Sequence, residues 1–305
     1  MSDATEPTGY TKEILKEHLS ALGIRKGNIL LVKASLKSVG KVVGGAQALV
    51  DAFVETVGEE GTVISASFVS GYPLPFSEED AKKVVTVETP SYAGAFTNTM
   101  VKDPRMYRSR HPLQKFVAIG KDAKELMERH TAQTGAYEVV NWMIEKGGLN
   151  VKVGDDDKVP GIGTTHVAIL QLGLKQKTED YGVNYLDADG QVKFFQRNWA
   201  GGCARGFINF IPLYEKEGAI LATGHVGNAA AKMTDLKKTL EIELRVLREN
   251  PSFFLCDDPL CSSCRTSWEF LKKTPSYYLM KTFAPLVRGT KISASIKSLR
   301  KRLAR

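Results

Sequence analysis

The sequence predicts an α/β fold, because segments with helical periodicity alternate along the chain with short apolar runs. At 305 residues, with 43% hydrophobic and 25% charged residues, the chain has the composition of a globular protein rather than a fibrous or disordered one. It shows no internal repeat and no linker clear enough to separate two domains. We therefore expect one α/β domain over residues 10–270, preceded by a disordered segment at 1–9 and followed by a basic tail at 271–305.

The first elements follow one another closely. Apolar residues at helical spacing predict a helix over 10–22, and the run 28–32 predicts a buried strand. A helix over 46–57 and a strand over 61–68 come next. The stretch 69–90 is rich in proline and glycine, so we expect a long loop that forms the rim of a substrate site.

The second half of the chain continues the alternation. The predicted elements there are a strand at 116–119, a helix at 121–129, a strand end at 159–163, a helix at 164–174 and a leucine-rich helix at 234–247.

The segment between the first strand and the second helix, residues 35–46, is the most informative. It contains Ser35, Ser38, Gly40, Gly44 and Gly45, which allow the backbone to approach a ligand closely. The following helix points its free N–H groups and positive dipole end at this turn. A phosphorylated cofactor fits such a turn. The alternative is a plain strand-to-helix connection in which glycine serves geometry alone.

The positive charge is concentrated at one end. Residues 272–305 contain ten Lys or Arg and no acidic residue, so they contribute +10 to a net charge of +8 and leave the rest at −2. This distribution argues against a nucleic-acid-coating protein. Residues 292–303 have the pattern of a basic amphipathic helix, which either packs on its own domain or docks on an anionic membrane or an acidic partner.

No stretch resembles a signal peptide or a membrane span, so we expect a cytoplasmic protein. In a reducing compartment, regularly spaced cysteines indicate either a metal site or thiols with no functional role. Cys256, Cys261 and Cys264 form a C-x4-C-x2-C pattern, and Cys203 is the remaining cysteine. There are two interpretations. The four cysteines form a structural zinc site as thiolate ligands, or they are four thiols that bind no metal.

Further motifs follow the glycine turn in order. They are Gly58-Glu59-Glu60-Gly61-Thr62, Arg108-Ser109-Arg110-His111-Pro112, Gly202-Cys203-Ala204-Arg205-Gly206-Phe207 and Gly224-His225-Val226-Gly227-Asn228-Ala229. Together with the turn, this series resembles the aminoglycoside 3-N-acetyltransferase family. The resemblance implies a mixed central sheet with flanking helices, and transfer of an acyl group, usually acetyl, from CoA to an amine.

The resemblance also implies which residues hold acetyl-CoA or another acyl-CoA. They are Lys33, Ser35, Leu36, Lys37, Ser38, Val43, Gly44, Gly45, Arg108 and Ser109. Two positions depart from the family pattern, because Lys33 replaces a histidine and Ala34 replaces the first of two serines. We therefore expect the site for the CoA diphosphate to be rebuilt rather than copied.

The family base is a histidine on a helix that opens with threonine after a Gly-x-Gly turn. An ungapped count reaches Gln171, which cannot take a proton at neutral pH. A shortened turn instead aligns His166, and we prefer this alignment because deletions in a connection cost little. Ile169 then stands where the family has a glutamate, so the base lacks its orienting carboxylate. His111 is a second, weaker catalytic candidate.

Two functions remain open. The first is an N-acyltransferase whose small-molecule acceptor is an amino sugar, free or nucleotide-linked, or an aminoglycoside-like amine. The second is a non-catalytic descendant that binds acyl-CoA. A polycationic acceptor needs carboxylates, and the acidic runs 77–80 and 155–157 are either such groups or solvated loop charges. The acyl group, the acceptor and the oligomeric state stay undetermined from sequence.

Overall fold

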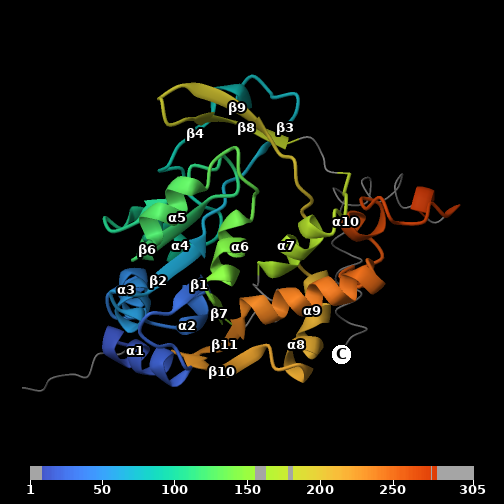
Figure 1. Ribbon diagram of the computed structural model, residues 1–305. Coiled ribbons are helices and arrows are strands. Elements are labelled where there is room, and N and C mark those ends of the chain that lie inside the picture. The colour runs from blue at the N-terminus through green and yellow to red at the C-terminus, as the bar shows by residue number, and fades with distance from the viewer. Residues whose placement is uncertain (1–8, 155–162, 178–180, 276, 280–305) are drawn as a thin grey trace, which may run out of the picture.

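The computed structural model describes residues 9–154, 163–177, 181–275 and 277–279. These residues contain a seven-stranded sheet of order β10-β11-β7-β1-β2-β6-β5, with helices on both faces (Figure 1). Its strands are Ile29–Ala34 (β1), Thr62–Ala66 (β2), Tyr107–Arg108 (β5), Phe116–Gly120 (β6), Leu149–Val153 (β7), Ile220–Val226 (β10) and Ala229–Asp235 (β11). The predicted α/β class and the mixed central sheet are confirmed.

The helices lie between the strands along most of the chain. They are Lys12–Ala21 (α1), Leu36–Val39 (α2), Gly45–Val57 (α3), Ala95–Lys102 (α4), Ala123–Arg129 (α5), Glu138–Glu145 (α6), Thr164–Gln171 (α7), Ile211–Lys216 (α8), Leu236–Glu249 (α9) and Ser262–Arg265 (α10), with short 3-10 turns at Asp80–Lys82 and Gly206–Phe210. Within the described ranges, no helix has the length and apolar character needed to cross a membrane.

Three neighbouring strands at the centre of the sheet are parallel. β1 pairs with β2 on one side and with β7 on the other, and both pairings are parallel. β6 and β11 extend the sheet outward as antiparallel strands. Because parallel strands end at the same edge, the carboxyl ends of β1, β2 and β7 lie together there. Such an edge is where open α/β sheets usually bind ligands.

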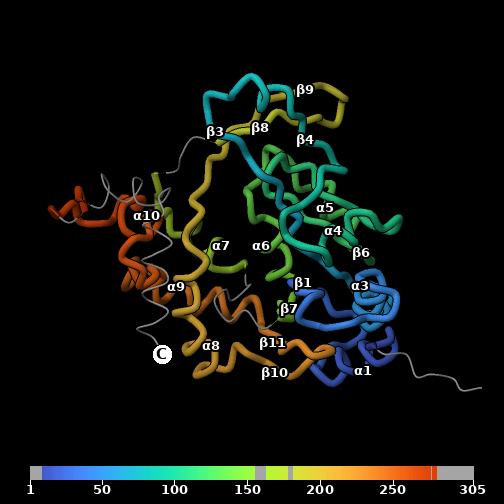
Figure 2. Tube along the Cα trace, turned by 180° about the vertical axis from the view of Figure 1, so that it is seen from behind, coloured from blue at the N-terminus to red at the C-terminus, as the bar shows by residue number. Residues whose placement is uncertain are grey.

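Residues along β1 alternate between two hydrophobic cores. Leu30 and Val32 pack with α1, α3 and α4, whereas Leu31 packs with α6, α7 and α9. This alternation follows from the two-residue repeat of a strand. Figures 1 and 2 show α1 and α3 on one side of the sheet and α7 and α9 on the other. The sheet is therefore covered on both faces, as its near-continuous apolar strands require.

A second, smaller sheet stands beyond one end of the central sheet, at the top of Figure 1. Its strands are Tyr72–Pro73 (β3), Val84–Val85 (β4), Tyr181–Leu186 (β8) and Val192–Gln196 (β9). The stretch 69–90, predicted as one long loop, thus contributes two short strands. Both pair with β8, about a hundred residues later, and a local sequence pattern carries no information about that partner.

Two other expectations are corrected. The helix predicted to begin at residue 234 begins at Leu236, because the chain up to Asp235 pairs as strand β11 and the Asp235 side chain then caps the helix. The central strand β7 was not predicted. Three predictions fall on segments outside the described residues. They are the disordered N-terminus, of which only residue 9 is described, the amphipathic helix at 292–303, and the strand end at 159–163, of which only residue 163 is described.

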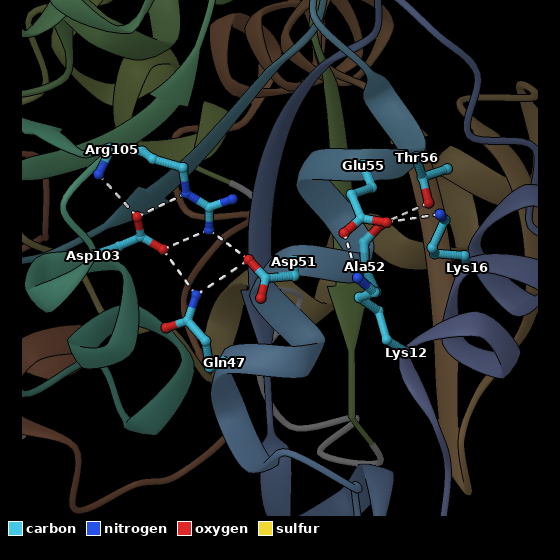
Figure 3. Close-up of polar contacts among 9 residues, drawn as sticks. All are labelled: Lys12, Lys16, Gln47, Asp51, Ala52, Glu55, Thr56, Asp103 and Arg105. Carbon is cyan, nitrogen blue, oxygen red and sulfur yellow. Dashed lines mark hydrogen bonds and ion pairs between the residues drawn. The ribbon is translucent and has the colours of Figure 1, made fainter.

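Helix α3 is held from both sides by charged side chains (Figure 3). Lys12 and Lys16 of α1 contact the carboxylate of Glu55 at 2.6 and 2.7 Å. On the other side, Arg105 contacts Asp51 at 2.5 Å. Each exposed pair contributes little to the free energy of folding. The pairs matter here because they set the position of α3. They fix the helix whose first turn follows the glycine-containing segment.

Candidate functional site

The glycine turn lies directly after β1 and leads into α3. Ser35 caps the short helix α2, and the Ser38 hydroxyl lies 3.0 Å from the Ser35 hydroxyl. Gly44 and Gly45 have φ of 82° and 65°, which other residues rarely adopt. The first turn of α3 has no side-chain cap. The Gly45 N–H donates to the Val42 carbonyl at 3.0 Å, which leaves the N–H groups of Ala46 and Gln47 for an anion. Lys33 and Lys37 add exposed cations beside it.

The hairpin between β10 and β11 supports this turn from behind. The Asn228 N–H donates to the Val39 carbonyl at 3.0 Å, and the Tyr10 hydroxyl donates to Asn228 Oδ1 at 2.5 Å. A Cβ on Gly227 would lie 2.4 Å from the Val39 carbonyl oxygen. The late motif that ends at Ala229 therefore holds the glycine turn in place, although it is almost two hundred residues away in sequence.

A cavity of about 450 Å³ opens at the ends of the parallel strands, and we call it the strand-end cavity. Lys33 and Ala34 of β1 and Ser65 of β2 line one side, and Phe207 lies among the other lining residues. Most of its wall is apolar. Ala34, which directly precedes the glycine turn, lines this cavity, so the cavity opens next to the turn.

A second cavity of about 410 Å³ lies toward the small sheet, and we call it the rim cavity. Its lining includes Gly71 from the beginning of the predicted rim, Arg197 and Gly201. The two cavities share four wall residues, namely Phe68, Tyr92, Tyr137 and His166. A group on one of these residues can therefore face ligands in both cavities.

His166 sits in the first turn of α7 between aromatic rings. Its imidazole stacks on Tyr137 with 4.6 Å between ring centroids and meets the edge of Phe207 at 5.0 Å. Its Nδ1 is buried and has no hydrogen-bond partner among the described residues. Burial lowers the pKa of His166 to about 4, the nearby Arg197 charge adds to this, and a hydrogen bond with the Gly201 backbone opposes it. The ring is thus neutral at pH 7 and can accept a proton.

Gln171 occupies a different position. It is the exposed last residue of α7 and lines neither cavity. Five residues along a helix turn the side-chain direction by about 140°, so the two residues cannot exchange roles. Ile169 is fully buried in the apolar core and places no carboxylate beside His166.

A buried carboxylate that the sequence analysis missed lies behind α7. Glu243 of α9 is fully buried and accepts hydrogen bonds from Thr165 Oγ1 at 2.5 Å and from the Tyr214 hydroxyl. Burial raises its pKa to about 7. The signal was present, because residue 243 falls on the apolar stripe of a helix that also carries Leu236, Leu240 and Leu247.

Three predicted site residues hydrogen-bond backbone groups inside the protein. The Arg108 guanidinium donates to backbone carbonyls of Ser67, Val87 and Thr89. Ser109 is fully buried and its hydroxyl accepts from the Phe116 N–H at 2.9 Å.

His111 Nδ1 accepts from two backbone N–H groups, and its ring stacks on His130. None of the three lines either cavity, and neither do the glycine-turn residues 35–46. Their assignment as cofactor-binding or catalytic residues stays a prediction.

The first acidic run, residues 77–80, lines neither cavity. Asp80 begins the 3-10 turn Asp80–Lys82 and pairs with Lys83 at 2.9 Å. The second run, 155–157, lies outside the described residues. The sulfur atoms of the four cysteines, in contrast, come together within 4.8 Å of one another.

Comparison with known proteins places this geometry in a family. The family model for aminoglycoside 3-N-acetyltransferase matches residues 31–248. A Bacillus subtilis relative, the SPbeta prophage-derived aminoglycoside N(3')-acetyltransferase-like protein YokD, is 33% identical over 156 residues. That alignment covers 45% of this chain and 57% of the relative, so it spans little more than half of the relative's length.

Solved structures share the fold. AAC-VIa bound to sisomicin has a TM-score of 0.70 and 22% identity, covering 79% of this chain and 98% of that one. AAC-IIIb with CoASH has a TM-score of 0.68 and 18% identity, covering 79% and 97%. The family model spans well over half of the sequence, from the central strand β1 to the end of α9, and the chain therefore belongs to the aminoglycoside 3-N-acetyltransferase family.

Proposed function

We propose that this protein is an acyl-CoA-dependent N-acyltransferase, with acetyl the expected acyl group, acting on the amino group of an amino sugar. The observation that carries the proposal is the position of His166 in the wall between the strand-end cavity and the rim cavity. One cavity opens next to an anion-accepting turn, and the other lies beside the first. A proton acceptor between them stands where an amine and a thioester would meet.

The glycine turn fits the diphosphate of CoA. The uncapped first turn of α3 offers N–H donors, Gly44 and Gly45 allow close approach, and Lys33 and Lys37 supply positive charge. The thioester end would occupy the largely apolar strand-end cavity and reach His166. The CoASH bound to AAC-IIIb supports this choice of cosubstrate.

His166 would act as the general base. As the amine nitrogen bonds to the thioester carbonyl carbon, Nδ1 takes the proton from that nitrogen. The carbon–sulfur bond then breaks, and the CoA thiolate that leaves takes up the proton from His166. The backbone of Gly201, which hydrogen-bonds the ring, would orient it in place of the glutamate that Ile169 replaces. Bound geometry adds to this, because holding two reactants in place supplies several kcal/mol of the barrier.

The lining of the rim cavity favours an acceptor with an acidic group. Among the described residues, its wall contains Arg197 and no aspartate or glutamate. Arg197 lies over the Trp199 ring at 5.5 Å and has no carboxylate partner in the described part of the chain. A polycationic aminoglycoside would meet a like charge there, whereas the phosphates of a nucleotide-linked amino sugar would meet a matching one.

The acyl-CoA assignment is tested at the glycine turn. Ser38→Asp introduces a negative charge beside the proposed diphosphate site, so acetyl-CoA should no longer raise the melting temperature of this variant. Ser252→Asp adds the same charge on the exposed turn after α9 and should bind like the wild type. Equal acetyl-CoA binding by Ser38→Asp and the wild type would contradict the assignment.

The acceptor class is tested at Arg197. Arg197→Gln should lower kcat/KM about 10- to 100-fold for an acidic, nucleotide-linked amino sugar, mainly through KM, because a charged hydrogen bond is lost. The same variant should change little with a neutral amino sugar. Lys193→Gln removes an equal charge from the exposed face of β9 and serves as the control. Preference of the wild type for a polycationic amine would overturn this acceptor class alone.

A non-catalytic acyl-CoA-binding role is the second candidate, and the replacement of the family glutamate by Ile169 favours it. Release of free CoA thiol separates the two roles. Turnover with any amino sugar supports the enzyme, and tight acetyl-CoA binding with no thiol release across neutral, acidic and cationic amines supports the alternative.

A further inference from the structure

We infer that Cys203, Cys256, Cys261 and Cys264 bind one structural zinc ion. Their sulfur atoms all lie within 4.8 Å of one another, although Cys203 is more than fifty residues from the others. A zinc ion with metal–sulfur bonds of about 2.3 Å holds four tetrahedral sulfur ligands about 3.8 Å apart. The cluster is close to that spacing, and a single ion would draw it together.

Ordinary packing does not explain the cluster. The three buried cysteines form a group separate from both hydrophobic cores, and within the described residues only Cys203 and Leu255 pack against it as further apolar partners. Free cysteines that act as small apolar residues mix with aliphatic side chains instead. All four thiols are free, and a disulfide would join them only in pairs. Four convergent sulfurs are the ligand set that zinc prefers in closed structural sites.

The surrounding backbone suits thiolate ligands. The Cys256 N–H donates to Cys264 Sγ at 3.3 Å, and the Cys264 N–H closes a turn on the Cys261 carbonyl at 3.1 Å. Two cations lie beside the cluster. The Arg265 side chain donates to the Cys256 carbonyl and, at 3.2 Å, to the Asp258 carbonyl. Arg205, two residues after Cys203, pairs with Asp258 at 3.0 Å. Four thiolates around Zn²⁺ carry a net charge of −2, which N–H donors and nearby cations offset.

The zinc site would join two segments next to the cavities. Cys203 lies between Gly201, which lines the rim cavity, and Phe207, which lines the strand-end cavity and contacts the His166 ring. Linking Cys203 to residues 256–264 fixes this part of the wall. Four protein ligands leave no open coordination position, so the ion holds structure and takes no part in a reaction. The site stands independently of the proposed function.

The metal content of the full-length chain tests the inference. The protein is produced in zinc-supplemented medium and purified with reductant but without chelator. Inductively coupled plasma mass spectrometry should then find about one zinc per chain. Refolding with Co²⁺ should give the visible absorption of a tetrahedral thiolate site. Modification of the thiols with a mercurial should release the metal to a coloured chelator.

Variants locate the site. Cys264→Ser and Cys203→Ser should lose most of the zinc, and Ser263→Ala, which lies between two ligands in sequence, should retain it. If a cysteine variant does not fold, the zinc content and the cobalt spectrum of the wild type still decide. Three results for the wild-type protein would each overturn the inference. The first is no zinc and no tetrahedral cobalt spectrum, the second is iron as the only metal, and the third is pairing of the four cysteines as disulfides under reducing purification.

Discussion

Replacing His166 with glutamine should lower kcat for acyl transfer by about 10²- to 10⁴-fold, the usual contribution of a positioned general base. Glutamine preserves much of the side-chain size between Tyr137 and Phe207, so acetyl-CoA binding should persist. Release of CoA thiol measures the rate, and a thermal shift measures binding. Loss of binding together with rate would instead indicate that the substitution disturbed the cavity.

Two matched variants sharpen this experiment. Gln171→Ala tests the ungapped alignment and should leave the rate unchanged, as should His225→Gln on β10, which lines neither cavity. The pH profile adds a second readout. Because the pKa of His166 is lowered to about 4, the neutral base is lost only as pH falls toward 4, and a decline of kcat/KM centred near the ordinary histidine value of 6.5 should not be caused by this group. Full activity of His166→Gln would remove it as the base.

Replacing Glu243 with glutamine should remove a pH-dependent loss of stability of about 3 kcal/mol between pH 4.5 and pH 8, since the pKa of Glu243 is raised from 4.5 to about 7. An acid with a raised pKa keeps its proton in the folded state between pH 4.5 and 7, where the unfolded chain has lost it. Its contribution to stability therefore falls as pH rises through this window. Glutamine removes that loss and can still accept hydrogen bonds from Thr165 and Tyr214.

The measurement is denaturant unfolding of both proteins from pH 4 to pH 8. The stability gap should be largest above pH 7 and close as pH falls toward 4.5. The buried histidines have lowered pKa values, so their contribution to stability rises with pH. This contribution is the same in both proteins and cancels when their free energies of unfolding are subtracted. Glu241→Gln, an exposed change on the same helix, should show no such gap. A constant gap at all pH values would show that Glu243 does not titrate in this range.

The sequence supported the parts of the site that depend on local chemistry. Glycines, serines and a following helix predicted the turn before α3, and the thiol spacing offered a four-cysteine site as one of two interpretations. Strand β7 was missed although Leu149, Val151 and Val153 alternate with Asn150 and Lys152, a pattern that indicates a strand with one polar, exposed face. Those polar residues are buried only because neighbouring strands and helices cover them, which no local pattern reveals.

Motif matches identified residue types but not their partners. Arg108, Ser109 and His111 match the family element, yet each is used inside the protein to hold backbone groups. Arg197 showed no motif at all and reaches the rim cavity only because β8 and β9 pair above it. Roles that depend on which distant segments meet therefore required the structure.

The shared wall between the two cavities has a consequence for the order of events. Separate volumes meet at Phe68, Tyr92, Tyr137 and His166, so an acceptor does not have to wait for CoA to leave before it binds. Transfer would then proceed in a ternary complex of the protein with both substrates, without a covalent acyl-enzyme intermediate. A single molecule that joined CoA to the acceptor would fill both volumes at once and gain from linking two binding sites.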